Sequence, residues 1–165
     1  MLGNFPNFLH TKKQSFFSAT KTGVFIEMRI LFVCKHNRFR SRVASAYYNQ
    51  LKKGNKNKAI GAGIYPNNDP LDKNEVEISK DFGIDIKGEP RKLNEKMLKW
   101  SDLTIIVADD VKLSQIKNHE KYKIVVWKIN DTDIGNKKEI KKIIKKIINR
   151  VNSLNKRLKK EVINK

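Results

Sequence analysis

The sequence predicts an α/β fold, a three-layer sandwich in which helices cover both faces of a four-stranded parallel sheet. Four short runs of apolar, mostly β-branched residues are each typical of a buried strand. Segments with helical spacing of apolar residues lie between these runs, and strands that alternate with helices are joined by right-handed crossovers into a parallel sheet. The length of 165 residues suits one domain with a core of its own.

The first half of the chain is expected to contain two strands and two helices. The first strand covers residues 29–33 (RILFV), a run of β-branched and aromatic side chains. A helix follows over residues 41–53, and the second strand, residues 59–64, is weaker because two glycines interrupt it. A turn-rich stretch then leads to a helix over residues 73–82. Each of these helices is followed by a glycine, which is a common C-terminal stop.

The second half continues the alternation. Asn94 is a good N-cap for a short helix that ends at residue 100, and the third strand follows over residues 103–108 (LTIIVA). A helix is expected over residues 111–118, and the fourth strand over residues 123–127 (KIVVW). The chain then forms a long helix over residues 137–162, with an apolar stripe that packs on the core. The stripe consists of Ile140, Ile143, Ile144, Ile147, Ile148, Val151, Leu154 and Leu158.

The charge is strongly positive and unevenly distributed. Lys and Arg number 36 against 17 Asp and Glu, which gives a formal net charge of +19. Residues 134–165 alone hold 12 basic and 2 acidic residues. The lysine pairs of the long helix are expected to form its solvated face, and a composition rich in Lys, Asn and Ile accounts for much of the excess. An open alternative is weak, non-specific binding of polyanions through this basic C-terminal helix.

The composition excludes several classes of protein. One cysteine cannot form an internal disulfide, which indicates a reducing compartment and a cytoplasmic location. With one cysteine and three scattered histidines, we expect neither a structural metal nor a cofactor. No apolar run approaches the ~20 residues of a membrane span.

The first 27 residues differ from the rest of the chain. They contain no acidic residue before Glu27 and show no clear periodicity, and Met28 directly precedes the first strand. We expect a disordered or misannotated N-terminal extension over residues 1–27, with a transit peptide as the alternative. Residues 28–165 are expected to form the single α/β domain.

Ligands of open parallel sheets bind beyond the carboxyl ends of the strands. Three chemically useful side chains follow strands at this edge, because Cys34 follows the first strand, Asp109 the third and Asp131 the fourth. The sequence therefore directs attention to the loop after the first strand.

This loop reads CKHNRFRS over residues 34–41 and opens the first helix. A cysteine facing backbone N–H groups at a helix N-terminus gains stabilisation of its thiolate, and the same groups form a concave nest for a tetrahedral oxyanion. Arg40 can close over that anion with two parallel hydrogen bonds. Ser41 can donate to the sulfur, and Asn37 tolerates the left-handed backbone that such a loop often needs, while its amide can bridge loop segments.

The loop resembles that of the low-molecular-weight protein tyrosine phosphatase family, whose fold is shared with thioredoxin-coupled arsenate reductases. The family loop is Cys-x5-Arg-Ser at this place. Further similar segments are AGI at 62–64, FGID at 82–85, RKL at 91–93, SDLTIIVADD at 101–110 and WKIND at 127–131. The resemblance covers about residues 28–155 and implies a four-stranded parallel sheet of order 2-1-3-4.

The resemblance also implies an activity, hydrolysis of protein tyrosine phosphate or another phosphomonoester through a phosphocysteine intermediate. Cys34 would attack phosphorus, Arg40 would hold the phosphoryl oxygens, and Asp131 would protonate the leaving group and then activate water, without a metal. The residues expected to bind substrate are Lys35, His36, Asn37, Arg38, Phe39, Arg40 and Ser41. The expected partner is a phosphorylated protein or a small phosphoester.

Two departures from the family pattern affect the site. The family usually has Asp-Pro and an aromatic residue where this chain has Asp131, Thr132 and Asp133, so Asp133 is a rival for the role of general acid. Lys35, Arg38 and Arg42 make the rim of the loop basic, which predicts a preference for highly anionic phosphoesters or acidic phosphopeptides.

Two other functions stay open. An arsenate reductase-like enzyme would need an external thiol, because the chain has no second cysteine to resolve the adduct. A non-catalytic module that binds phosphate or polyanions would keep the loop without a working acid.

Overall fold

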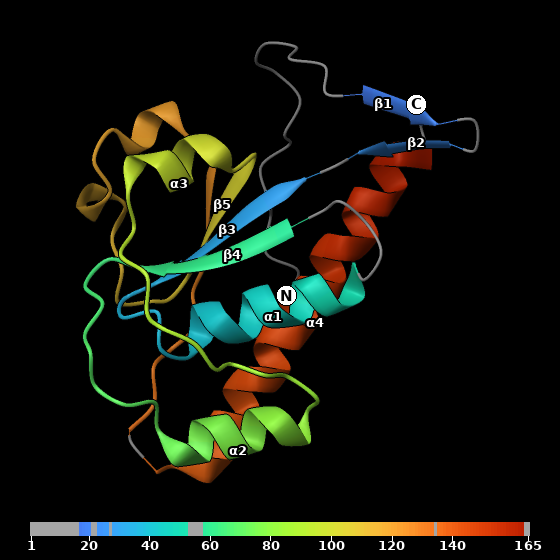
Figure 1. The fold of residues 1–165 in the computed structure, drawn as a ribbon. Helices are drawn as coiled ribbons and strands as arrows, with labels where there is room; N and C mark the ends of the chain where they lie inside the picture. The colour runs from blue at the N-terminus through green and yellow to red at the C-terminus, as the bar shows by residue number, and fades with distance from the viewer. Residues whose placement is uncertain (1–16, 21–22, 27, 53–57, 134, 164–165) are drawn as a thin grey trace.

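The computed structural model describes residues 17–20, 23–26, 28–52, 58–133 and 135–163 (Figure 1). Four strands form a parallel sheet in the order β4 (Lys58–Gly63), β3 (Arg29–Cys34), β5 (Leu103–Val107) and β6 (Ile124–Trp127). Counted along the domain, this order is the predicted 2-1-3-4. The central strand β3 is therefore flanked on both sides, and its last residue, Cys34, lies opposite Gly63 of β4.

Helices cover both faces of the sheet, which confirms the three-layer arrangement (Figure 1). One face carries α1 (Arg40–Leu51), α2 (Lys73–Asp81) and α4 (Lys137–Ile163), and the other carries α3 (Glu95–Trp100). Side chains of β3 alternate between the two cores because successive residues of a strand point to opposite faces. Phe32 packs with Tyr48 and Trp127 on the α1 face, whereas Leu31 and Val33 pack with Leu98 on the α3 face.

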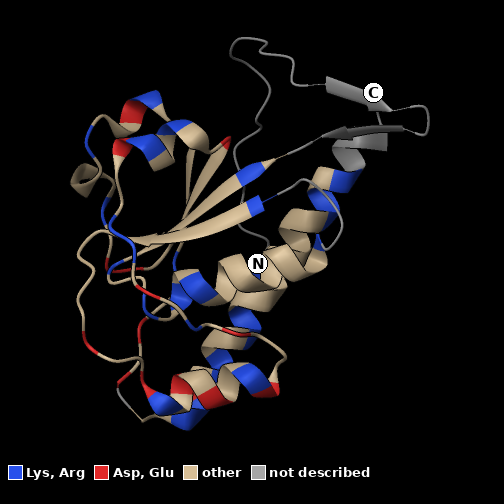
Figure 2. Ribbon diagram, viewed as in Figure 1, with Lys and Arg blue, Asp and Glu red and all other residues tan. Residues whose placement is uncertain are grey.

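The C-terminal helix α4 has the predicted amphipathic pattern. Its buried stripe consists of Ile140, Ile143, Ile144, Ile147 and Val151, with Ile148, Leu154 and Leu158 partly buried beside it. Its first three lysine pairs are exposed, and Figure 2 shows basic residues along the length of the helix. Tyr47 of α1 donates a hydrogen bond to Asn152 Oδ1 at 3.0 Å, which ties the second half of α4 to the domain. Binding of polyanions by the exposed lysines stays a prediction.

One predicted helix is wrong. Over residues 111–118 the chain forms only a 3₁₀ turn, η1 (Leu113–Gln115), followed by a second one, η2 (His119–Lys121). Asn118 adopts a left-handed conformation with φ of 56°, and the Gln115 side chain accepts a hydrogen bond from the Lys112 backbone N–H. These local contacts compete with an α-helix.

Part of the N-terminal segment forms two short strands. β1 (Phe17–Thr20) and β2 (Gly23–Ile26) pair antiparallel in a separate sheet. The rest of residues 1–27, apart from these strands, lies outside the described residues, so the prediction of a disordered or misannotated extension stays a prediction. In the described part of the chain, no helix combines the length and apolar character needed to cross a bilayer.

Candidate active site

The loop of residues 35–39 joins the centre of the sheet to the start of α1. Cys34 ends β3, is a free cysteine and is 3% exposed. Helix α1 begins at Arg40, and its N-cap, Phe39, has no side-chain oxygen to accept from the first backbone N–H groups. Helix N-termini with N–H groups left over in this way favour bound anions.

The Asn37 side chain bridges segments of the loop, as the sequence predicts. It has a φ of 53°, in the left-handed region, and is buried. Its Oδ1 accepts from the Arg91 backbone N–H at 2.9 Å, and its Nδ2 donates to Ser41 Oγ at 2.7 Å. Ser41 Oγ in turn lies 3.1 Å from Cys34 Sγ. Because the serine oxygen already accepts from Asn37, its own hydrogen can point to the sulfur and stabilise a thiolate.

The two glycines that weaken the second predicted strand make room for this loop. A Cβ on Gly63 would lie 2.7 Å from the His36 carbonyl carbon and 2.8 Å from the Asn37 nitrogen. A Cβ on Gly61 would lie 2.8 Å from Asn37 Nδ2. Real Cβ atoms do not approach other heavy atoms so closely, so β4 carries glycine where the loop crosses it.

Arg42 does not belong to the rim of the loop, contrary to the expectation from the sequence. It is 7% exposed, and its Nη1 donates to the Ile86 and Gly88 carbonyls at 2.9 and 2.6 Å. Its Nε donates to the Asn37 carbonyl. Burial lowers the pKa of Arg42, and the nearby Arg91 lowers it further. Arg42 therefore supports the loop from behind and leaves the rim less basic than predicted.

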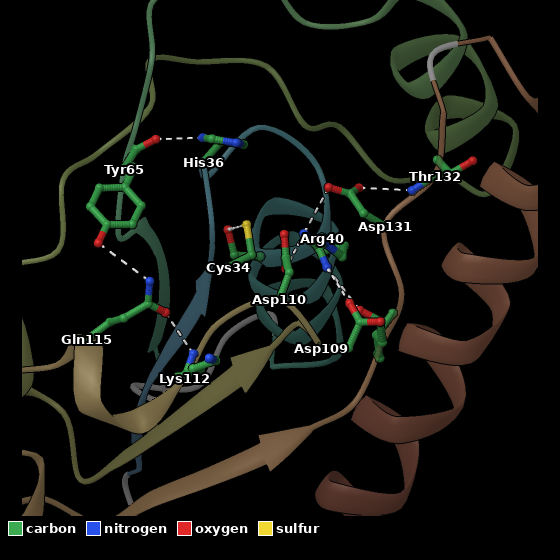
Figure 3. A network of polar contacts seen from close by, with 12 residues as sticks. Cys34, His36, Arg40, Tyr65, Asp109, Asp110, Lys112, Gln115, Asp131 and Thr132 are labelled. Carbon is green, nitrogen blue, oxygen red and sulfur yellow. Dashed lines mark hydrogen bonds and ion pairs between the residues drawn. The ribbon is translucent and has the colours of Figure 1, made fainter.

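Arg40 lies at the centre of a polar network built from three strand ends (Figure 3). Its side chain is 3% exposed, and Nη1 donates to the Ile129 carbonyl at 2.9 Å. Nη2 lies 2.9 Å from Asp110 Oδ1 and 3.0 Å from Asp131 Oδ2, and Nη1 lies 3.6 Å from Asp109 Oδ1. Asp109 and Asp131 are both anticipated by their positions after strands, whereas sequence reasoning missed Asp110. Its one signal is its place directly after Asp109.

One cavity of about 130 Å³ brings the three predicted catalytic residues together. Cys34, Arg40 and Asp131 all line it, whereas Asp133 lines a neighbouring cavity with Asn136 and Glu139. A single water needs only about 15 Å³, so the space suits a tetrahedral oxyanion in contact with the residues that line it. Cys34, Arg40 and Asp131 thus come from different elements and meet at the carboxyl edge of the sheet.

The residues expected to bind substrate divide into two groups. His36, Arg38, Phe39 and Arg40 line the cavity with Cys34. Lys35, Asn37 and Ser41 lie outside its lining, with Asn37 and Ser41 buried in the loop itself.

Three further residues that line the cavity were not predicted, namely Asp72, Glu75 and Thr132. Asp72 is the N-cap of α2 and accepts from the Asn74 and Glu75 backbone N–H groups, so the start of α2 forms one wall of the cavity. Burial raises the pKa of Glu75 to about 7, and the negative charges of Asp72 and Asp131 add to the effect.

A parallel four-stranded sheet with a Cys-x5-Arg-Ser loop at its central strand is typical of α/β proteins that bind an oxyanion at a cysteine. Residues 29–164 match the family model described as low molecular weight phosphotyrosine protein phosphatase. The chain therefore belongs to this family. No protein with curated annotation shows significant sequence similarity to it.

Solved structures agree with this placement. A low molecular weight protein tyrosine phosphatase from T. tengcongensis is 27% identical, with a TM-score of 0.69, over 79% of this chain and 99% of that one. The YwlE arginine phosphatase from Geobacillus stearothermophilus is 18% identical, with a TM-score of 0.71, over 83% and 96%. An arsenate reductase from Archaeoglobus fulgidus is 24% identical, with a TM-score of 0.62, over 76% and 97%. The last two similarities show the shared fold.

Proposed function

We propose that the protein hydrolyses phosphomonoesters, of the kind found on protein tyrosine, through a phosphocysteine intermediate. The observation that carries this proposal is the single cavity lined by Cys34, Arg40 and Asp131. A nucleophile, a doubly donating cation and a carboxyl group on one small cavity are the parts that a two-step phosphoryl transfer requires.

In the first step the Cys34 thiolate attacks phosphorus as the bond to the ester oxygen breaks. Asp131, in its protonated form, gives its proton to that oxygen, and the alcohol or phenol leaves. Arg40 stabilises the charge on the transferring phosphoryl group with its parallel N–H donors. In the second step Asp131 takes a proton from water, whose oxygen attacks phosphorus. The P–S bond breaks, phosphate departs, and Ser41 donates its hydrogen bond to the returning thiolate.

The Arg40–Asp131 contact gives substrate binding a direct effect on the acid. Asp131 Oδ2 occupies the Nη2 donor at 3.0 Å, and a phosphate oxygen would compete for the same donor. A dianionic phosphate is the stronger acceptor, so its binding would release Asp131 from the guanidinium. The carboxyl group would then be available to the leaving oxygen.

The free thiol of Cys34 is essential to this cycle, which agrees with the cytoplasmic location expected from the sequence. The proposed partner is accordingly a phosphorylated protein or a small phosphoester in a reducing compartment.

The general acid is tested by comparing Asp131→Asn with Asp133→Asn. We expect Asp131→Asn to lower kcat for phenyl phosphate by about 10²-fold, because phenolate needs a proton to leave. The loss in kcat/KM, which reports the first step alone, should be smaller for p-nitrophenyl phosphate, whose leaving group needs no proton. The second step uses Asp131 in the same way for both esters. Asp133→Asn, which removes the same charge two residues away, should stay within about twofold of the wild type. Steady-state hydrolysis at mildly acidic pH measures all three proteins.

The outcomes of this experiment separate the alternatives. A larger loss in Asp133→Asn would assign the acid to Asp133. A wild-type protein that hydrolyses neither ester but reduces arsenate with added glutathione would be a reductase. One that does neither while binding phosphate would be a non-catalytic module.

Gly63→Ala tests the crossing of the loop over β4. The added Cβ would displace the backbone of His36 and Asn37, and we expect kcat/KM for p-nitrophenyl phosphate to fall by about 10²-fold. The thermal unfolding midpoint should also fall by several degrees, because the added methyl group overpacks a buried position against backbone. Unchanged kcat/KM would show that the loop can move away without cost.

A further inference from the structure

Glu75 is an ionisable group in the cavity of Cys34 that the proposed mechanism does not use. It stands in the first turn of α2, and its side chain lines the cavity together with Arg40 and Asp131. Its backbone N–H donates to Asp72 Oδ1 at 3.1 Å, so the helix cap fixes its position. Within the described part of the chain, its carboxyl group has no hydrogen bond or ion pair that would give it a purely structural role.

Glu75 shares this cavity with charged side chains of both signs. Asp72 and Asp131 disfavour its ionised form, whereas Arg38 and Arg40 favour it, and His36 and Cys34 are the other ionisable groups of the lining. Asp131 is the residue proposed to protonate the leaving oxygen. Because Glu75 and Asp131 line the same cavity, a leaving group that reaches Asp131 comes within electrostatic range of Glu75.

The basic rim expected from the sequence is only partly present at this cavity, because Arg38 lines it whereas Lys35 and Arg42 do not. Arg42 is turned behind the loop. Arg38 is held by the Pro70 carbonyl and lies 3.7 Å from Asp69. The wall that the start of α2 contributes is acidic instead, with Asp72 and Glu75.

We propose that Glu75 is a specificity-determining residue, which selects phosphoesters with a neutral or positively charged leaving group over those with an anionic one. This inference rests on the proposed function and reverses the preference that the sequence predicts. A negative charge close to Glu75 would be repelled in a partly desolvated cavity, whereas a cation would be attracted.

The selectivity should depend on pH with a definite sign. Burial and two neighbouring carboxylates raise the pKa of Glu75 to about 7. Below pH 6 the group is mostly neutral and should discriminate little. Above pH 8 it is mostly ionised and should discriminate most. Because Asp131, Cys34 and His36 line the same cavity, the two ligands compared should differ in charge at one substituent alone.

Two benzylphosphonates provide that comparison, one with a 4-aminomethyl and one with a 4-carboxylate substituent. Both carry the same phosphonate, so ionisations of the phosphonate, Cys34 and His36 largely cancel in the ratio of their dissociation constants. Calorimetry at pH 6 and pH 8 would measure this ratio for the wild type, Glu75→Gln and Glu77→Gln. Glu77 is exposed on the same helix and controls for the loss of one charge.

We expect the wild type at pH 8 to prefer the cationic ligand about tenfold more strongly than Glu75→Gln does. This difference should shrink at pH 6, and Glu77→Gln should behave as the wild type. Equal ratios in the wild type and Glu75→Gln, or an equal effect of Glu77→Gln, would overturn the inference. Unfolding midpoints would confirm that the glutamine variants fold.

The binding measurement is independent of turnover. Phosphonates that bind with the expected ratios to a protein that hydrolyses no ester would refute the proposed function and leave the role of Glu75 intact. Normal hydrolysis, with a ratio of dissociation constants that Glu75→Gln leaves unchanged, would support the proposed function and refute the role of Glu75. Failure of both phosphonates to bind would count against both proposals.

Discussion

Cys34→Ser is expected to lower kcat for p-nitrophenyl phosphate by at least about 10⁴-fold, the largest effect of any single change in the chain. A serine hydroxyl at this position is not ionised near neutral pH and is a far weaker nucleophile than a thiolate. The substitution is nearly isosteric, and the side chain at this position is buried beside Ser41, so the fold should persist. Stopped assays of hydrolysis, with the unfolding midpoint as a control, measure the effect.

The same variant also tests the covalent intermediate. Acid quenching of the wild type during turnover, followed by mass spectrometry, should find phosphate on Cys34, the single cysteine of the chain. Cys34→Ser should show no phosphocysteine while it still binds phosphate through Arg40. Activity within tenfold of the wild type would contradict a cysteine nucleophile.

Arg40→Lys is expected to lower kcat/KM by about 10³-fold. The guanidinium reaches the Ile129 carbonyl with one nitrogen and Asp131 and Asp110 with the other, and it lines the cavity with Cys34. A lysine ammonium keeps the charge but cannot present two parallel donors in a plane, which the equatorial phosphoryl oxygens require. Both kcat and the affinity for phosphate should therefore fall.

Arg91→Lys is a suitable control for this prediction. Arg91 is exposed, and it contacts the loop through its backbone N–H, which the substitution leaves in place. Steady-state kinetics and phosphate titrations of both variants distinguish the two positions. A comparable loss in Arg91→Lys would show that the effect is not specific to the cavity. A kcat/KM for Arg40→Lys within a few-fold of the wild type would show that charge alone is sufficient.

Apolar periodicity predicted most of the fold, because burial of apolar side chains in the core determines which segments become strands and helices. The isoleucine stripe of α4 and the four apolar runs are long-range features that local contacts do not override. The segment of residues 111–118 has a weaker apolar pattern, with Val111 and Ile116 as its buried residues. There a left-handed Asn118 and the Gln115 side chain produced 3₁₀ turns instead.

The candidate site was predictable where position along a strand determines it. Cys34, Asp109 and Asp131 follow strands that end at one edge, so their meeting follows from the order of the sheet. The direction in which a side chain points was not predictable in the same way. Arg42 lies inside α1 and not directly after a strand. The direction of its side chain depends on the Ile86 and Gly88 carbonyls, which come from a distant loop.

Glu75 was not predicted, because its role also depends on packing between segments that lie far apart in the sequence. A glutamate in the first turn of a helix is ordinary, and its importance arises only because the start of α2 lies against the loop after β3.

Cys34, the single cysteine of the chain, also determines how the protein responds to peroxide. A sulfenic acid on Cys34 could not condense with a second thiol of the same chain, because there is none. Repair would therefore depend on a small reductant from solution that enters through the opening used by the ester, forms a mixed disulfide and is displaced by a further thiol. A bound oxyanion that closes this opening would protect the sulfur from the oxidant and would equally delay its rescue.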